Sequence, residues 1–351
     1  MKVALIALSV RGAMGQYLEA LVPPLSKVVE VHLFVPFHFM GETGEAIVHR
    51  FATGFNQRQA LLRFLNPLAA WRVWREVRVV APGVVHLFNG EGYPWSLIFA
   101  LGSYRDQIPL LVTVHDPEPH PGNTWEAMNA WLRRAVLPLA AGVHVHSKRF
   151  VEVVERLKIE RERIHVIPHG SIAERFLKYR QTGIKREPLA LFFGRLEAYK
   201  GVDLLVDAAI RLNGEIRVII AGPGKLPTWL EQKIRDNVNI FELHNRYLED
   251  AEVAHLFQQA SVCVLPYRQA TQSSLPLIAA AFGVPVVATA VGAFVEDVPR
   301  VGGILVPPEN VEALAQGIFQ AMQKKPVYPE EMRFENLAGR FVTVYRSICG
   351  R

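Results

Sequence analysis

Short apolar, β-branched runs alternate with longer amphipathic segments along most of the chain, which predicts strands separated by helices. The first half holds predicted strands at Val3–Leu8, Val29–Val35, Val84–Phe88, Leu110–Val114, Gly142–His146 and His165–Pro168. The predicted helices between them are Gln16–Ser26, Gln57–Arg78, Trp125–Leu139 and Lys148–Leu157. Because continuously apolar strands must be covered on both faces, this order predicts an α/β layer structure around a parallel sheet.

A second series of the same kind begins at residue 189. Its predicted strands are Leu189–Phe193, Arg217–Ala221, Asn239–Leu243, Val262–Pro266, Val286–Thr289 and Gly303–Val306. Its predicted helices are Val202–Leu212, Pro227–Asn237, Ala251–Gln259, Leu275–Phe282 and Val311–Met322. The series are joined at Ser171–Pro188, whose polar part, Lys178–Pro188, shows neither strand nor core-helix pattern. We predict two doubly wound domains, residues 1–175 and 176–333, which face each other across a cleft, and a last helix in residues 334–351.

The amino-acid composition is that of a globular protein and excludes several other classes. The 351 residues are 50% hydrophobic and 21% charged, which excludes disordered, collagen-like and coiled-coil chains. Two cysteines, Cys263 and Cys349, provide neither a disulfide framework nor a four-cysteine zinc site. The apolar stretch Val3–Leu8 is short for a signal peptide, and no window reaches the roughly 18 apolar residues that span a bilayer. We therefore expect a cytoplasmic protein without a transmembrane segment.

The charge balance is basic, with a net charge of +6. Such a balance is compatible with an anionic ligand or an anionic surface. Residues 50–78 combine six arginines with a single acid and five aromatic residues: Arg50, Arg58, Arg63, Arg72, Arg75, Arg78, Glu76, Phe51, Phe55, Phe64, Trp71 and Trp74. This segment either lies peripherally on an anionic membrane face or combines core aromatics with solvated arginines. Nucleic acid is not an expected partner, because the charge is spread and no recognition motif is present.

Two loops of the first series carry candidate chemistry. The first strand runs into a turn with Gly12 and Gly15, which lacks both the dinucleotide and the Walker spacing. This turn is either a plain tight turn or a place where backbone approaches a ligand. The fourth strand runs into His115, Asp116 and His120. We expect no metal there, because no third ligand or H-E-x-x-H pattern accompanies them; His115 is either a ligand contact or structural.

The second series offers two further candidate sites. Arg195 and Lys200 flank the loop between a strand and a helix, where two cations can hold a diphosphate or form an ordinary solvated loop. Ser273 and Ser274 precede an apolar helix that begins at Leu275. The start of that helix suits a phosphate or sugar hydroxyls, or the serines simply cap it.

A nucleotide base has a candidate contact as well. Arg246 and Tyr247 follow another strand, where they could stack on or hydrogen-bond a base, or belong to the surface.

Four motifs, in this order and spacing, resemble the retaining family-four glycosyltransferases of the GT-B fold over nearly the whole chain. They are His165–Gly170, Gly194-Arg195 with Lys200-Gly201, Ala221–Gly224, and Gly283–Thr289 with Val291-Gly292. The resemblance implies sugar transfer from a nucleoside-diphosphate sugar to a glycan or lipid-linked hydroxyl acceptor, with retention and with neither a metal nor another cofactor.

The resemblance also implies roles for individual residues. It places the donor diphosphate on Arg195 and Lys200, the donor sugar on His115, and the Gly12–Gly15 loop under the donor or acceptor. It further implies that the last helix, around Phe334–Ser347, crosses back onto the N-terminal domain.

The chain departs from the family at one point. The family usually has two glutamates eight residues apart, and counting back from Gly283 those positions are Ala270 and Ile278. Gln272, Ser273, Ser274 and the Leu275 N–H would then hold the sugar and distal phosphate, with Glu296 as a substitute carboxylate. Two alternative functions follow: a catalytically silent sugar-nucleotide-binding or scaffold protein, and a GT-B-like nucleotide-sugar epimerase.

Overall fold

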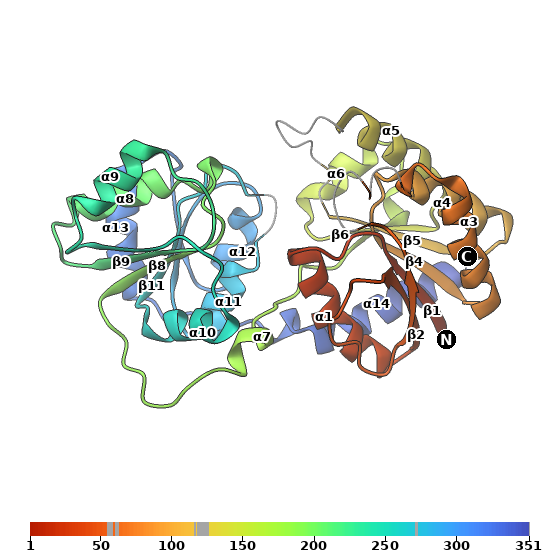
Figure 1. Cartoon of the computed structure of the whole chain (residues 1–351), viewed down its shortest axis with the longest axis horizontal. Helices are drawn as coiled ribbons and strands as arrows, with labels where there is room; N and C mark the ends of the chain where they lie inside the picture. The colour runs from red at the N-terminus through yellow and green to blue at the C-terminus, as the bar shows by residue number, and fades with distance from the viewer. Residues whose placement is uncertain (55–58, 60–62, 116, 118–125, 271–272, 351) are drawn as a thin grey trace. The chain divides into compact units, whose positions relative to one another are not determined.

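The chain folds into two compact units (Figure 1). The computed structural model describes residues 1–54, 59, 63–115, 117, 126–270 and 273–350. Unit 1 comprises Met1–Gly170 and Glu331–Arg351, and unit 2 comprises Ser171–Glu330.

Unit 1 is built on a parallel sheet that has seven strands within the described residues, in the order β3-β2-β1-β4-β5-β6-β7. The strands are β1 (Lys2–Ala7), β2 (Glu30–Pro36), β3 (Ile47–Phe51), β4 (Val84–Asn89), β5 (Leu110–Val114), β6 (Gly142–Val145) and β7 (Ile164–Val166). The winding direction reverses between β1 and β4, so the loops that follow these two strands flank the switch point where ligands bind in such sheets.

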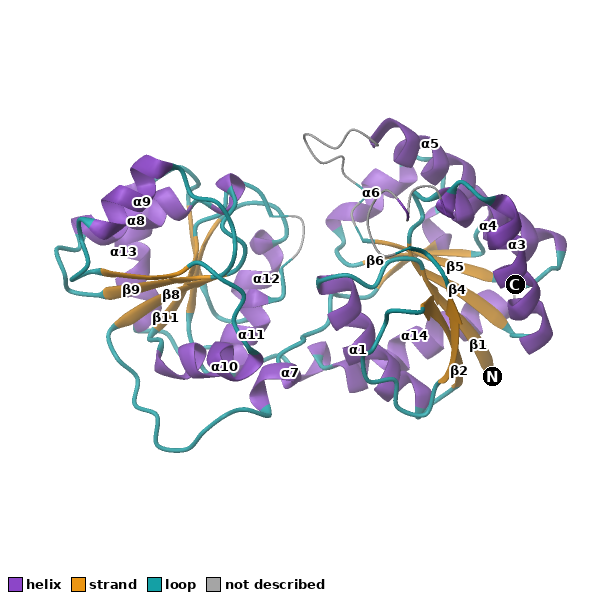
Figure 2. Ribbon diagram, in the orientation of Figure 1, coloured by secondary structure: helices purple, strands orange, loops and turns teal. Residues whose placement is uncertain are grey.

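Helices cover both faces of this sheet (Figure 2). They are α1 (Ala13–Ser26), α3 (Pro67–Val80), α4 (Pro94–Arg105), α5 (Glu126–Val136), α6 (Arg149–Glu155) and α14 (Phe334–Cys349), with short 3₁₀ turns at Leu137–Leu139, Arg161–Arg163 and Glu330–Met332. Helix α4 packs between α3 and α5, and α14 packs against α1. The C-terminal helix therefore belongs to unit 1, although the whole of unit 2 separates it in the sequence from the first 170 residues.

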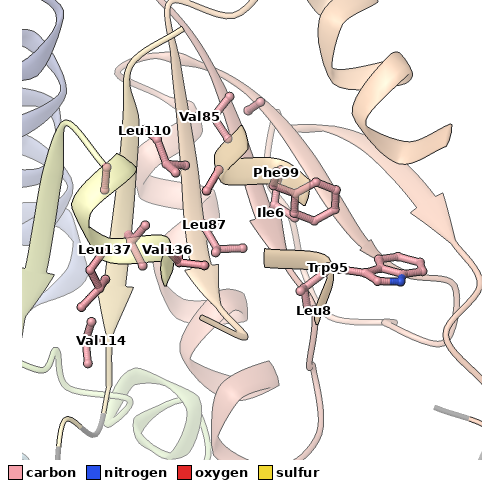
Figure 3. Close-up of a cluster of buried hydrophobic side chains, with 14 of the residues drawn as sticks. Ile6, Leu8, Val85, Leu87, Trp95, Phe99, Leu110, Val114, Val136 and Leu137 are labelled. Atoms are coloured by element: carbon pink, nitrogen blue, oxygen red, sulfur yellow. The ribbon is translucent and has the colours of Figure 1, made fainter. Parts of the chain in front are cut away.

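Side chains of β4 alternate between the two faces of the sheet, and helices pack on both faces. Val85 and Leu87 join an apolar cluster with Trp95 and Phe99 of α4 (Figure 3), while the intervening His86 faces α14. Helix α3 begins next to this cluster at Pro67, where the Asn66 side chain accepts hydrogen bonds from the first backbone N–H groups. An N-cap and a proline in the first turn are the expected start of a helix.

A chain of buried hydrogen bonds fastens α14 to the sheet. The Tyr345 hydroxyl donates to His86 Nδ1 (2.8 Å), and His86 Nε2–H donates to the Thr113 hydroxyl (2.7 Å). Thr113 then donates to His144 Nδ1 (2.9 Å), and His144 Nε2–H donates to the Ile167 carbonyl (2.9 Å). His144 Nε2 must donate, because the Ile167 carbonyl solely accepts. Burial lowers the pKa of both His86 and His144, so both rings are neutral near pH 7, and the chain runs in this direction.

Unit 2 contains a second parallel sheet, with six strands in the described part of the unit, in the order β10-β9-β8-β11-β12-β13. The strands are β8 (Leu189–Phe193), β9 (Arg217–Ala221), β10 (Phe241–His244), β11 (Val262–Leu265), β12 (Val286–Thr289) and β13 (Ile304–Val306). The helices are α7 (Glu174–Leu177), α8 (Val202–Arg211), α9 (Thr228–Arg235), α10 (Asp250–Gln259), α11 (Leu275–Ala281), α12 (Phe294–Arg300) and α13 (Val311–Met322), with a 3₁₀ turn at Ala198–Lys200. Here the switch point lies between β8 and β11.

The predicted fold class is confirmed: each unit is a doubly wound, Rossmann-like α/β unit. The sequence pattern missed the edge strand β3 and the helices α4, α7 and α12. Helix α4 is nearly uncharged and α12 is short and contains Pro299, so neither displays an amphipathic period. The predicted helix Gln57–Arg78 is α3 from Pro67 onward; residues 57, 58 and 60–62 lie outside the described residues.

Candidate functional site

Three neighbouring strand ends of unit 2 are tied together by their loops. Leu196 N–H, after β8, donates to the Pro223 carbonyl after β9, and Gly224 N–H donates to the Asn245 side chain after β10. Gly222 has a φ of 136°, and a Cβ at this position would overlap the Gly194 carbonyl. Glycine is therefore required for this close approach of two loops.

These loops line an open pocket of about 460 Å³. Its lining includes Arg195, Glu197, Lys225 and Tyr247. The Tyr247 side chain is 82% exposed, so its ring is available to a planar ligand. Arg195 is also exposed, and its guanidinium lies 2.6 Å from the Glu197 carboxylate. A phosphate bound to Arg195 would compete with Glu197 for the same guanidinium.

Lys200, which the sequence pairs with Arg195, has a different environment. It is half-buried at the end of the 3₁₀ turn, and its Nζ lies 3.8 Å from the centroid of the Tyr267 ring, next to the end of β11. Burial, and secondarily the charge of Arg195, lowers the Lys200 pKa to about 7. Within the described ranges, this ammonium forms no ion pair.

The first turn of α11 lies near β8, because a Cβ on Gly194 would be 3.9 Å from the Leu275 side chain. Ser274 makes no side-chain cap, whereas the Ser273 hydroxyl is 3.4 Å from Leu275 N–H. Pro276 stands in the first turn, as predicted. Gln272 lies outside the described residues.

The two family glutamate positions are both apolar and buried. Ala270 is 7% exposed and Ile278 is 1% exposed. The Ala270 carbonyl accepts a hydrogen bond from Ala293 N–H, and Gly292 packs directly against that carbonyl. The loop at Ala270 is thus fixed by its backbone, and neither side chain offers a hydrogen-bonding group.

Arg246 and Glu296 are placed less favourably for ligand binding. The Arg246 guanidinium pairs with both oxygens of Glu252 (3.0 and 2.5 Å), which belongs to the capping box of α10. Glu296 is partly buried in the first turn of α12 and has interactions of its own. Beside it, burial raises the pKa of Asp297 to about 6, despite an ion pair with Arg300.

In unit 1, His115 follows β5 and is held through both ring nitrogens. Nε2–H donates to the Phe88 carbonyl (2.9 Å), and Nδ1 is 3.0 Å from His146 Nε2. Burial, followed by the charge of His169, lowers the His115 pKa to about 3, so the ring is neutral near pH 7. Asp116 and His120 lie outside the described residues.

Gly12 lies in the loop between β1 and α1 and Gly15 in the first turn of α1, and backbone geometry accounts for both glycines. Gly12 precedes α1 with a φ of 56°, and a Cβ there would meet no atom within 4 Å. A Cβ on Gly15 would overlap the Val10 carbonyl. Gly15 is thus required for packing at the start of α1, while Gly12 leaves the loop open.

The aromatic residues of the basic segment mainly build the core. Phe51, Phe64 and Trp74 are buried, whereas Arg72 and Arg75 are exposed on α3. Arg58 and Phe55 lie outside the described residues. No helix within the described ranges is both long and apolar enough to cross a bilayer. Across the same ranges, no group of three His, Cys, Asp or Glu side chains is placed to hold a metal ion.

The sequence reasoning missed Lys225 and Tyr267. Lys225 comes directly after the glycine turn Gly222–Gly224, so its position after a strand end could have marked it. Tyr267 follows β11 by two residues, but nothing in the sequence indicates that Lys200 lies over its ring.

Two family profiles match the chain. One, described as glycosyltransferase family 4, matches residues 14–175, and the other, described as glycosyl transferases group 1, matches residues 187–324. An uncharacterized glycosyltransferase of Methanocaldococcus jannaschii is 28% identical over 176 residues, which are 46% of this chain and 45% of the relative. The lipopolysaccharide core biosynthesis mannosyltransferase LpsB of Rhizobium meliloti is 31% identical over 179 residues, which are 46% and 51% of the two chains.

The chain spans about half the length of these curated relatives. Among solved structures, Anabaena HepE in complex with UDP superposes with a TM-score of 0.70 at 19% identity, covering 100% of this chain and 99% of that one. Sucrose-phosphate synthase of Thermosynechococcus elongatus gives 0.72 at 17% identity, covering 100% and 99%.

The fold and the two matched halves define the class: glycosyltransferases of the GT-B fold. Within that class, the two matched halves make the chain similar to the family-four glycosyltransferases.

Proposed function

We propose that the protein transfers a sugar from a nucleoside-diphosphate sugar to a glycan or lipid-linked hydroxyl, with retention at the anomeric carbon. One observation carries the proposal: Arg195 and Lys200 share the loop after β8, at the switch point of unit 2, and Arg195 lines a pocket with Lys225 and Tyr247. Two cations suit a diphosphate and an exposed tyrosine suits a base. The solved structure of HepE with UDP supports this class of donor.

The proposed chemistry relies on stabilising the leaving group. Arg195 and Lys200 would neutralise the departing diphosphate as the anomeric bond breaks, with the first turn of α11, from Ser273 to Leu275, near the distal phosphate. An oxygen of that phosphate would take the proton of the acceptor hydroxyl on the same face of the sugar. This route needs no pair of carboxylates, which agrees with the apolar Ala270 and Ile278.

Two features of unit 1 are assigned roles within the proposal. His115 would contact the donor sugar as a neutral ring, because burial lowers its pKa to about 3. The open space at Gly12 would admit donor or acceptor. We propose no metal in the reaction, because the two cations supply the positive charge.

A donor panel tests the function. Thermal unfolding is followed with UDP-, GDP-, ADP- and dTDP-sugars in the presence of EDTA, and a bound donor raises the midpoint by mass action. The binding donor is then incubated with hydroxyl acceptors, and the anomeric configuration of the product is read by NMR. Transfer with retention in EDTA is expected; transfer with inversion, or only with added metal, would contradict the mechanism.

The same assay separates the two alternatives. A silent sugar-nucleotide-binding or scaffold protein, supported by the apolar Ala270 and Ile278, would bind the donor without releasing nucleotide. A nucleotide-sugar epimerase would interconvert the free donor, which NMR detects without any acceptor.

We also propose peripheral contact with anionic membranes, through α3. The exposed side of this helix presents Leu68, Arg72, Arg75 and Val79, which combine apolar and cationic groups. Co-sedimentation with vesicles containing phosphatidylglycerol should exceed that with neutral vesicles and should fall in the Arg72→Gln/Arg75→Gln variant. Equal sedimentation with both lipids would remove this proposal, and Arg211→Gln in unit 2 provides a control that removes one exposed arginine outside α3.

A further inference from the structure

The loop that carries Lys200 is clamped by a third cation, Arg268, which follows β11. The Arg268 guanidinium donates to both carboxylate oxygens of Asp203 (2.8 and 2.7 Å), to the Ala198 carbonyl (2.9 Å), and pairs with Glu309 (2.6 Å). Its backbone N–H donates to the Tyr199 carbonyl (2.7 Å). One residue therefore holds the turn before Lys200, the start of α8 and the segment before α13.

The neighbouring backbone shows how closely the two loops fit. Gly201 has a φ of 66°, and a Cβ there would overlap the Pro266 carbonyl. Glu309, a partner of Arg268, is a non-glycine residue with a φ of 55°, a conformation that costs about 1 kcal/mol and that surrounding contacts must maintain. The clamp thus fixes the backbone on both sides of Lys200 and sets Tyr267 beneath its ammonium.

Arg268 itself is not available to a phosphate. Its guanidinium already faces two carboxylates and a carbonyl, and hydrogen bonding to Asp203 is the main cause that raises its pKa. In return, Arg268 lowers the Asp203 pKa, so the pair stays ionised at neutral pH. A third anion would have to displace a forked pair with two short hydrogen bonds.

We propose that Arg268 is a positioning residue that acts through Lys200: it holds the ammonium over Tyr267, where it meets the donor phosphate. The identity of the ligand rests on the proposed function. The clamp itself is a relationship between residues of unit 2, and it can be measured without a donor.

A double-mutant cycle tests the proposal by calorimetric titration of UDP, GDP and ADP, using the tightest binder. Arg268→Gln should weaken binding about tenfold in the wild-type background and less than about twofold in the Lys200→Ala background. Arg268→Lys keeps the charge but loses the bidentate contact with Asp203, so its affinity should lie between those of Arg268→Gln and the wild type. Equal losses in both backgrounds, or full affinity in a folded Arg268→Gln variant, would overturn the proposal.

A second readout needs no nucleotide. The pH dependence of Lys200 acetylation, measured by mass spectrometry, should have its midpoint near 7 in the wild type. The midpoint should move towards the ordinary lysine value, about 10.4, in Arg268→Gln. An unchanged midpoint would refute the clamp. If no nucleotide binds the wild type, the proposed function fails, and acetylation still decides the role of Arg268.

Two further variants serve as controls: one tests the clamp with a milder change than Arg268→Gln, and the other tests whether loss of any positive charge in unit 2 weakens binding. Glu309→Gln removes one carboxylate from an exposed side chain, and it should weaken binding about threefold only while Lys200 is present. Unchanged affinity in this variant would also count against the clamp. Arg211→Gln breaks an exposed ion pair with Glu312 in the same unit, and binding should stay at the wild-type level.

Discussion

The Lys200 ammonium lies 3.8 Å from the centre of the Tyr267 ring, so a lysine after β8 is held by an aromatic residue after β11. These strands flank the switch point of unit 2. The contact accounts for the half-buried state of a charged side chain, because a cation over an aromatic face retains a favourable partner when it loses water.

This environment predicts pH-dependent donor binding. Burial lowers the Lys200 pKa to about 7, so the free protein loses this charge as pH rises through 7. A bound diphosphate favours the protonated ammonium, and binding above pH 7 must therefore take up a proton. We expect the Kd for the diphosphate to rise by up to about tenfold per pH unit between pH 7 and 9.

Titration calorimetry in buffers of different ionisation enthalpy measures this proton uptake directly. In Lys200→Gln the uptake should disappear. Constant affinity from pH 6.5 to 9 in the wild type would show that Lys200 does not meet the phosphate.

Loss of either loop cation should reduce turnover. Arg195→Ala and Lys200→Ala are each expected to lower turnover at least about 10²-fold, as removal of a donor to a developing oxyanion does. Steady-state rates of nucleotide release measure the effect, and Arg211→Ala in the same unit is the control. Wild-type-like rates in both variants would exclude the assignment of the diphosphate to this loop.

Alanine substitutions at two glycines should distinguish two causes of destabilisation: the left-handed backbone conformation alone, and that conformation together with a steric overlap. Gly201 and Gly214 have φ values of 66° and 83°, but only a Cβ on Gly201 would overlap a backbone carbonyl, that of Pro266. Gly214→Ala should lower the free energy of unfolding by about 1 kcal/mol, and Gly201→Ala by at least twice as much. Urea unfolding gives both values; equal losses would mean that the two loops separate easily.

A cluster of five buried or partly buried histidines in unit 1 predicts acid instability. Burial lowers the pKa of His115 to about 3 and those of His144 and His169 to about 4, and it places His86 and His146 well below 6.5. The unfolded chain binds protons near pH 6.5, whereas the folded unit resists them. Stability from these groups is therefore complete above pH 7 and is lost as pH falls from 6.5 towards 4, by up to about 1.4 kcal/mol per pH unit for each histidine.

Tryptophan fluorescence during urea unfolding follows this loss, because the buried Trp74 and Trp95 both belong to unit 1. His255→Gln, at an exposed position in unit 2, should leave the pH dependence unchanged. A midpoint that stays constant between pH 7 and 5 would show that the histidine cluster accepts protons without unfolding.

The sequence by itself determined the two α/β series and the loops that carry candidate chemistry. Several strands, such as Leu189–Phe193 and Arg217–Ala221, have the predicted bounds, because a strand buried on both faces is a continuous apolar run. The sequence marks Arg195 and Lys200 as candidates, because each is a charged residue next to glycine in the loop after a strand. The edge strand β3 and helix α4 were missed, since their patterns are neither continuously apolar nor amphipathic.

Only the tertiary structure decided which side chains meet. Tyr267 and Arg268 are 67 and 68 residues from Lys200, and they reach its ammonium and its loop because the parallel sheet brings β8 and β11 side by side. Glu309, 109 residues from Lys200, contacts Arg268. Likewise, Tyr345 and His86 are 259 residues apart and share a hydrogen bond. Periodicity encodes which face of an element is buried, whereas ionisation and hydrogen bonding depend on neighbours that sheet order selects.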